Sequence, residues 1–340
     1  MTYRVGHIGC GRMGTHHGEA YHVLLDTKIV CCMDPNEERL NIFCDRFDVP
    51  GRYTDLNEML ARESFDIAAA VVPVKFTKST VLRCVAAGVK GVFAEKPIAA
   101  TLEEADELVS VCHKAGVKFA CGAIWRSHPH AQFLSRQISN GAIGKLQSAT
   151  IYGMGGEVSG GGCHWLNMAR LLVGSEVDWV WGGMESNERA ESNEDGGAWG
   201  WLHFENGLVC PIIQNGGAKS GVEVVGEDGV VHWSKRACTM MKLDKSGGGR
   251  ALVPVKLSLP QLDLPEAEPT ILGGIRSLIG AIENGDELWC SGDDMRCVLE
   301  IAIALRESQR RGYVPVSLPL ADRSLRLNPI EERWSGYYAD

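Results

Sequence analysis

The sequence predicts an α/β protein with two domains: a doubly wound parallel sheet, followed by an α/β domain with a large, mostly antiparallel open sheet. The first observation is that short apolar strands alternate with amphipathic helices from residue 3 to about residue 122. The second is that strand-like segments separated by glycine turns follow Trp125 and Arg126. Because 340 residues exceed what one core usually holds, we expect the domains at residues 1–122 and 123–340.

The predicted strands of the first domain lie near residues 3–8, 28–33, 66–72, 91–94 and 117–121, with helices between them. Parallel strands need crossover helices that cover both faces of the sheet, so the strand at 67–72 can be apolar throughout. In the second domain we expect strands at 146–154, 199–205, 208–213, 221–226 and 230–233, and helices at 271–283 and 293–311. The Gly- and Pro-rich stretch 245–269 predicts loops and an irregular strand.

Composition excludes several classes of protein. The chain has 34 Lys and Arg against 43 Asp and Glu, a net charge of −9, and no basic cluster with interleaved aromatics, so nucleic acid is not an expected partner. The longest apolar stretches, such as 67–74, are too short to span a membrane, and no signal peptide precedes the first strand. Twelve scattered cysteines without a CxxC pair predict reduced thiols, a cytoplasmic location and no structural metal site.

A glycine-rich turn directly follows the first predicted strand and opens a helix. It consists of Gly9, Cys10, Gly11, Arg12, Met13 and Gly14. In this setting, backbone N–H groups can meet the pyrophosphate of a dinucleotide without obstruction by side chains. The motif therefore predicts that the first domain is a Rossmann domain that binds a nucleotide.

An acidic residue ends the second predicted strand. Asp34 lies twenty-five residues after Gly9, where a carboxylate can accept hydrogen bonds from the adenosine ribose hydroxyls and repel a 2′-phosphate. This favours NAD over NADP, although Arg39 nearby keeps NADP open. Asp34 can also cap the following helix, and the two roles can coexist.

A lysine follows the strand at 91–94, in the segment Glu95-Lys96-Pro97. The carboxyl ends of strands in open α/β sheets face the ligand crevice. A partly desolvated Lys96 beside an oxidised nicotinamide can accept a proton from a substrate hydroxyl while hydride leaves the same carbon. We therefore interpret Lys96 as a general base.

Four segments together resemble the glucose-fructose oxidoreductase, inositol dehydrogenase and MocA (Gfo/Idh/MocA) family: GCGRMG, AEKPIAATLEEA, HFENG…VVGEDGVVHW, and the closing helices from AIENGDELWC to PVSLPL. The resemblance covers nearly the whole chain. It implies a Rossmann domain, a C-terminal domain whose open sheet mediates homodimers or homotetramers, and NAD(P)-dependent oxidation of sugars, polyols or related compounds. It also implies that Lys96 is the catalytic lysine and that Glu95 and Pro73 lie along the cofactor.

The resemblance further implies that His164 belongs to the second active-site motif, which departs from the family pattern. The family's usual aspartate, four residues before this histidine, is Gly160 here, and the usual acid three residues after it is Asn167. The glycine run 160–162 predicts that His164 lies in the first turn of a helix reaching to about Leu172, where the helix N-terminus disfavours the imidazolium form. Glu157, Asp178 and Asp195 are candidates to replace the missing acid; alternatively, Lys96 alone carries the proton transfer.

Two further expected site residues come from the segment that joins the domains, and several aromatic residues and histidines elsewhere have other expected places. Trp125 and Arg126 match the family's linker and are expected to contact substrate, with packing between domains as a nearly equal alternative. Trp199 and Trp201 lie on one face of a strand; such aromatics can stack on a sugar ring, but they more often belong to the core or to an oligomer interface. His16 and His17 follow the glycine turn, and we expect both on the helix surface.

Together these patterns predict an NAD-dependent dehydrogenase that oxidises a hydroxyl of a sugar, an inositol-like polyol or a glycoside. Lys96 and His164 are the expected catalytic residues, and Lys96, Trp125, Arg126, His164 and Asn167 the expected substrate contacts. Two alternatives stay open. One is a hydride-shuttling glycosidase or epimerase that recycles bound NAD, and the other is a catalytically silent NAD- or sugar-binding protein.

Overall fold

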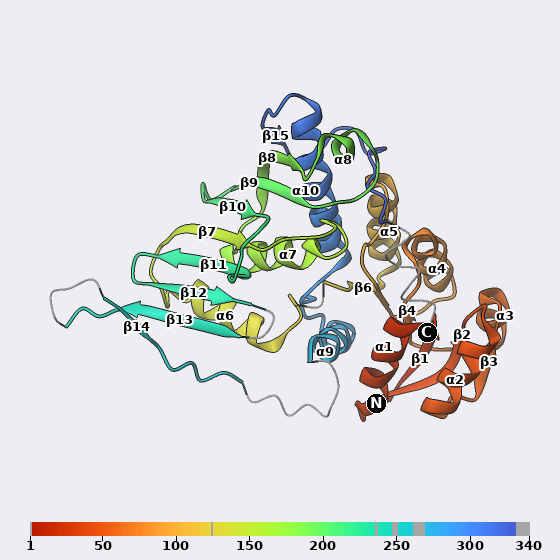
Figure 1. Ribbon diagram of the computed structural model, residues 1–340. Coiled ribbons are helices and arrows are strands. Elements are labelled where there is room, and N and C mark those ends of the chain that lie inside the picture. Colours follow the sequence, from red (N-terminus) through yellow and green to blue (C-terminus); the bar gives the residue numbers. More distant parts are fainter. Residues whose placement is uncertain (1, 124, 235–236, 247–250, 261–268, 331–340) are drawn as a thin grey trace. The chain divides into compact units, whose positions relative to one another are not determined.

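The structure is a computed structural model, which describes residues 2–123, 125–234, 237–246, 251–260 and 269–330 (Figure 1). The described chain forms two compact units. The first contains the residues up to Ser127 and also helix α9 and the start of helix α10, up to Arg296. The second contains residues from His128 up to 260 and from Cys297 to Pro329.

The first unit contains the predicted parallel sheet. Its six strands follow the order β3-β2-β1-β4-β5-β6, and each pairs in parallel with its neighbours. The strands are β1 (Tyr3–Ile8), β2 (Thr27–Met33), β3 (Gly51–Tyr53), β4 (Ile67–Ala70), β5 (Gly91–Ala94) and β6 (Lys118–Cys121). The helices are α1 (Arg12–Val23), α2 (Glu37–Phe47), α3 (Leu56–Arg62), α4 (Val74–Ala86), α5 (Leu102–Ala115) and α9 (Pro269–Asn284). The doubly wound fold is therefore confirmed, although the sequence missed the short strand β3.

Helix α9 changes the expected organisation of the first unit. It packs against α1, β5 and β6, and its Ile271, Leu272, Ile275 and Leu278 belong to the same buried cluster as Val5 of β1 and Phe43 of α2. The sequence predicted this helix correctly but assigned it to a continuous second domain at 123–340. The units of the structure interleave instead, because apolar burial rather than chain order decides which helix covers a sheet.

The second unit contains a nine-stranded sheet in the order β14-β13-β12-β11-β7-β10-β9-β8-β15 (Figure 1). The strands are β7 (Leu146–Tyr152), β8 (Val177–Met184), β9 (Ala198–Phe204), β10 (Val209–Ile213), β11 (Gly221–Gly226), β12 (Gly229–Trp233), β13 (Cys238–Leu243), β14 (Leu252–Pro254) and β15 (Val316–Ser317). Neighbouring strands pair antiparallel, with the exception of the β7–β10 pair, which is parallel. The expected antiparallel sheet is confirmed, and the sequence missed β8, β13 and β15.

Four helices accompany this sheet: α6 (Pro129–Ser139), α7 (Gly162–Val173), the short α8 (Asn187–Glu191) and α10 (Gly292–Arg310). Helix α7 packs on α6, β7 and β11. Along β9, Leu202 and Phe204 are buried, whereas Trp201, which precedes Leu202, is 47% exposed. This alternation shows that one face of the sheet is covered and the other is open at this strand.

All twelve cysteines are free thiols, and most of them are buried. Among the helices of the described residues, none is long and apolar enough to cross a membrane. No group of three or more His, Cys, Asp or Glu side chains in this part of the chain is arranged to hold a metal ion.

Candidate active site

The glycine-rich turn after β1 has the geometry that close approach of a phosphate requires. Gly9 has φ = 95°, and a Cβ at this position would lie 2.1 Å from the carbonyl oxygen of Val71. A Cβ at Gly14 would lie 2.1 Å from the carbonyl oxygen of Gly9, so only glycine lets α1 pack this close to the turn. Gly11 is the N-cap of α1 and offers no side chain to its N–H groups. These N–H groups can therefore bind an anion, which fits the pyrophosphate of a dinucleotide.

The other residues of the turn differ in exposure. Cys10 is buried, whereas Arg12 is exposed and Met13 is half-buried. The backbone N–H of Cys10 donates to Asp34 Oδ2 at 2.7 Å, so the turn is tied to the end of β2. Asp34 Oδ1 accepts a second bond from the N–H of Asn36 at 2.9 Å. Asn36, and not Asp34, caps α2, so capping does not explain Asp34, whose role toward the ribose stays a prediction.

The end of β4 lies against the glycine turn, because the Val71 carbonyl is the group that Gly9 accommodates. Pro73 follows as the N-cap of α4. Since β4 lies between β1 and β5 in a parallel sheet, the segments after these three strands share one edge. Gly9, Pro73 and Lys96 are therefore brought to the same edge of the sheet.

Glu95 lies at the centre of a buried polar contact next to Lys96. Glu95 is 7% exposed. Its Oε2 accepts a hydrogen bond from the backbone N–H of Lys96 at 3.2 Å, and its Oε1 lies 2.9 Å from His17 Nε2.

His17 is fully buried, so its expected place on the helix surface was wrong. His16, in contrast, is exposed and contacts Glu19. The helical spacing of buried Gly14, His17, Gly18 and Tyr21 is the sequence signal that would have found His17.

A second histidine is buried beneath the turn. His7 on β1 is 0% exposed, and its ring lies 4.6 Å from that of Phe43. Neither ring nitrogen has a hydrogen-bond partner among the described residues. Burial, reinforced by the nearby His17, lowers the pKa of His7 from 6.5 to about 3. His7 is therefore a neutral part of the core at physiological pH.

In the second unit, His164 lies where the glycine run predicts it. Helix α7 begins at Gly162 with Gly161 as its N-cap, so His164 is in the first turn and is 8% exposed. The carbonyl oxygen of Glu157 accepts bonds from the N–H groups of Gly161 and Gly162, both at 2.9 Å. The expected position of His164 in a helical first turn is confirmed, and its catalytic role stays a prediction.

The three candidate acids of the second unit have different surroundings. Asp195 is fully buried and accepts bonds from the N–H groups of Val158, Ser159 and Gly196 and from the Ser159 hydroxyl at 2.6 Å. Burial raises the pKa of Asp195 to about 6, with nearby Glu157 adding to the rise. Because these donors occupy both of its oxygens, Asp195 acts as an anchor for the segment that precedes α7.

Asp178 and Glu157 are placed differently. Asp178 Oδ1 lies 2.6 Å from His203 Nδ1, in a hydrogen-bonded contact between neighbouring strands β8 and β9. Glu157 is 6% exposed, and its Oε2 would lie 3.0 Å from a Cβ at Gly160. The Glu157 carboxylate thus occupies the space into which a side chain at residue 160 would extend.

Asn167 is fully buried on α7. Its Oδ1 accepts a bond from Arg170 Nη1 at 2.7 Å, and Arg170 also pairs with Glu176. This amide oxygen therefore orients an arginine within the second unit. Substrate binding by Asn167 stays a prediction.

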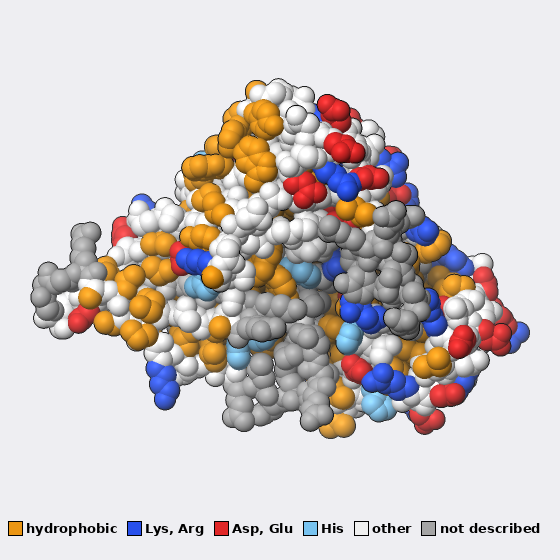
Figure 2. Space-filling model, viewed as in Figure 1, with side chains coloured by type: hydrophobic (Ala, Val, Ile, Leu, Met, Phe, Trp, Pro, Cys, Tyr) orange, Lys and Arg blue, Asp and Glu red, His pale blue; other side chains and the backbone are white. Residues whose placement is uncertain are grey.

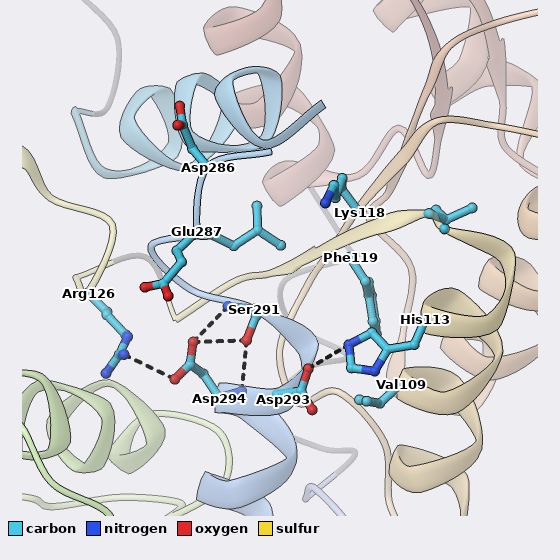
Figure 3. Close-up of a pocket in the computed structure, with 13 residues that line it drawn as sticks. Val109, His113, Lys118, Phe119, Arg126, Asp286, Glu287, Ser291, Asp293 and Asp294 are labelled. Atoms are coloured by element: carbon cyan, nitrogen blue, oxygen red, sulfur yellow. Dashed lines mark hydrogen bonds and ion pairs between the residues drawn. The ribbon is translucent and has the colours of Figure 1, made fainter. Parts of the chain in front are cut away.

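Arg126 is tied to the first unit by two contacts. Its Nε donates to the Trp289 carbonyl at 2.8 Å, and its Nη2 lies 3.1 Å from Asp294 Oδ1. It lines a cavity of about 490 Å³ beside the edge strand β6, where Asp293 also pairs with His113 from α5 (Figure 3). Lys96 does not line this cavity among the described residues. Trp125 is half-buried, and the substrate contacts expected of it and of Arg126 stay predictions.

Comparison with known proteins agrees with this geometry. Residues 3–123 match the Gfo/Idh/MocA family model, described as an oxidoreductase family with an NAD-binding Rossmann fold. The chain is 26% identical to myo-inositol 2-dehydrogenase of Thermotoga maritima over 328 residues, which cover 90% of this chain and 96% of the relative. It is 29% identical to 2,7-anhydro-N-acetylneuraminate hydratase of Mediterraneibacter gnavus over 139 residues, 41% of this chain and 36% of the relative.

A solved structure shows that the likeness in fold extends over both units. Aldose-aldose oxidoreductase from Caulobacter crescentus superposes with a TM-score of 0.77 at 20% identity, covering 94% of this chain and all of that one, 100%. The glycine turn, the six-stranded order of the sheet and these matches lead to one assignment. Residues 3–123 form the NAD-binding Rossmann fold that the model of the Gfo/Idh/MocA oxidoreductase family describes, and the chain as a whole is similar to the dehydrogenase named above.

Proposed function

We propose that this oxidoreductase oxidises a secondary hydroxyl of a sugar, an inositol-like polyol or a glycoside to the ketone, with NAD as the hydride acceptor and Lys96 as the general base. The observation that carries the proposal is that Lys96 follows β5 on the sheet edge that also presents the glycine turn. The name of the inositol dehydrogenase relative supports the substrate class. A turn built on Gly9, Gly11 and Gly14, with Asp34 at the end of β2, fits NAD, and NADP is the less favoured cofactor.

When bound, NAD accepts the hydride at its nicotinamide ring. The chain's own residues move the proton. Lys96 Nζ takes the hydroxyl proton as the carbon–hydrogen bond breaks, and the electron pair left on oxygen forms the carbonyl. His164, in the first turn of α7, orients the same hydroxyl by a hydrogen bond or exchanges a proton with it.

Glu157 is the acid that we propose in place of the family aspartate missing at Gly160. Its carboxylate already lies where a side chain at residue 160 would point. Asp195 has its oxygens occupied by backbone and hydroxyl donors, and Asp178 pairs with His203. Glu157 therefore fits the role better than either alternative.

The test is NADH absorbance during incubation of the enzyme with NAD or NADP and a panel of inositols, aldoses, polyols and glycosides. We expect NADH with one substrate group, and a fall of at least about 1000-fold in Lys96→Met, because the hydroxyl proton then has no acceptor. NAD affinity of Lys96→Met should stay within about threefold of wild type, since the glycine turn and Asp34 supply the expected contacts to the pyrophosphate and the ribose. A variant that retains most of the wild-type rate would remove Lys96 from the mechanism.

The hydratase relative favours a second candidate, in which bound NAD is reduced and reoxidised within one turnover. Transient oxidation of a hydroxyl acidifies the neighbouring C–H bond and permits elimination or epimerisation. This candidate predicts product without net NADH, and cofactor released when the purified protein is denatured. Stoichiometric NADH would exclude it.

We also propose that the protein assembles as a homodimer or homotetramer through the open face of the second sheet. Trp201 is 47% and Ile213 is 41% exposed, and apolar side chains gather over β8, β9 and β10 (Figure 2). An exposed apolar area of this kind is typical of a protein interface. A cytoplasmic location, supported by the free thiols, stays a prediction.

A further inference from the structure

The first unit contains a buried histidine that the mechanism above does not use. His17 belongs to the stripe of α1 that packs on the sheet, together with Gly14, Gly18 and Tyr21. A polar ring in such a stripe loses its hydration, which a hydrocarbon side chain of similar size would not. The rings of His17 and of Phe93 on β5 form a T-shaped pair, with 5.1 Å between their centroids. A hydrocarbon side chain would fill this position without the loss of hydration, so packing alone does not explain why residue 17 is a histidine.

The polar contact of the His17 ring leads toward Lys96. Its Nε2 lies 2.9 Å from Glu95 Oε1, while Nδ1 is buried and has no hydrogen-bond partner among the described residues. Because a carboxylate only accepts hydrogen bonds, Nε2 carries the hydrogen in this pair. His17 is thus a donor directed at a single carboxylate oxygen.

The other Glu95 oxygen is used at the same time. Oε2 accepts a bond from the backbone N–H of Lys96 at 3.2 Å. The third side of the carboxylate is closed by Gly122, where a Cβ would lie 3.2 Å from Oε1. The carboxylate is therefore held between α1, the end of β5 and the segment after β6, with one donor on each oxygen.

We propose that His17 is a positioning residue for the reaction, which acts through Glu95 to hold the backbone of Lys96 in place. The inference rests on the role of Lys96 in the proposed function. The lysine side chain has a flexible stem of four carbons. Nζ can therefore be placed accurately only if the Cα from which this stem extends is fixed. Loss of the His17 donor frees Glu95 to rotate, releases the Lys96 N–H and displaces the base relative to the substrate hydroxyl.

Three variants test this inference, with His16 as a matched control because it is the neighbouring histidine of α1 and is exposed. His17→Leu removes the donor and keeps an apolar side chain. His17→Gln retains an N–H donor. His16→Leu makes the same chemical change outside the buried pair. All are measured as NAD-saturated protein, with the active fraction counted by NAD binding.

We expect kcat of His17→Leu to fall about 10- to 100-fold, as small misplacements of catalytic groups do, while KM and the Kd for NAD stay within about threefold. His17→Gln should recover most of the rate, and His16→Leu should match wild type. A purely structural His17 would lower the amount of folded protein but not kcat per NAD-binding molecule. Full kcat in His17→Leu, or equal losses in His17→Leu and His17→Gln, would overturn the inference.

A second readout does not depend on activity. Hydrogen exchange followed by mass spectrometry on peptides that contain Glu95 and Lys96 should show about tenfold faster exchange in His17→Leu and no change in His16→Leu. Unchanged exchange would overturn the positioning role even in an active enzyme. If wild type forms no NADH with any substrate but exchange still rises in His17→Leu, the proposed function fails while the contact through Glu95 stands.

Discussion

At the scale of single residues, two buried histidines distinguish the first unit. His7 and His17 are both 0% exposed, yet only His17 has an acceptor, Glu95. His7 contributes a neutral ring to the core and no hydrogen bond among the described residues. The cost of burying His7 increases when the protein is acidified, because a charged ring cannot be solvated there.

His7 predicts an acid dependence of stability. Its pKa is about 3 in the folded protein and 6.5 in the unfolded chain, so between these values the unfolded state binds more protons. Stability from this group is fully present above pH 6.5 and is lost as pH falls toward 3, by up to about 1.4 kcal/mol per pH unit. The free energy of unfolding can be measured by denaturant unfolding of wild type and His7→Leu at several pH values. As the pH falls below 6.5, wild type should lose more stability than the variant. Parallel pH profiles for the two proteins would contradict this.

At the scale of elements, the β1–α1 connection depends on the absence of side chains. Gly9 is contacted by the segment after β4, and Gly14 by Gly9 itself, so one turn joins three pieces of backbone. The same closeness leaves the N–H groups of α1 accessible to a phosphate. The absence of side chains at Gly9 and Gly14 therefore permits both the close packing of α1 and the binding of a phosphate.

Gly9→Ala tests this coupling. Its Cβ would meet the Val71 carbonyl at 2.1 Å, so the turn must open and we expect the Kd for NAD to rise at least about tenfold. Gly88→Ala is the control, because Gly88 also has a positive φ (+84°) but no atom within 4 Å of its Cβ. It should lose about 1 kcal/mol of stability through backbone strain and bind NAD normally. Fluorescence titration with NAD measures the Kd of each variant. Equal Kd values for Gly9→Ala and Gly88→Ala would refute the steric explanation.

At the scale of the whole molecule, the second sheet presents an aromatic surface. The β8–β9 register pairs Trp181 with Trp201, and Trp181 and Trp199 meet edge to face at 5.5 Å. Trp179 stacks on His203 at 4.8 Å. Side chains of this size on an open sheet face are costly in water, which supports assembly of several copies.

Light scattering after gel filtration tests assembly. Wild type should have a mass of at least twice the 37.0 kDa chain, and Trp201→Asp should shift it toward the monomer because a carboxylate would be buried without a partner. Leu25→Asp is the control, since Leu25 is 99% exposed in the first unit. A monomeric wild type would refute the proposed oligomer.

Much of the fold follows from the sequence, because strand and helix patterns depend on local periodicity. The strands at 3–8, 91–94 and 221–226 were predicted to the residue. The strand at 177–184 was missed because Gly182 and Gly183 interrupt its pattern. In the structure these glycines lie close to β9 and α10, which no local pattern records.

For the candidate site, the sequence by itself determined the glycine turn, Asp34, Lys96 and the first-turn position of His164, since each depends on neighbours along the chain. The tertiary structure alone decided what depends on residues far apart in sequence. It brought His17 to Glu95 across 78 residues and placed α9 in the first unit. Burial of polar groups is the physical reason, because a side chain's partner in the core is chosen by packing and not by sequence distance.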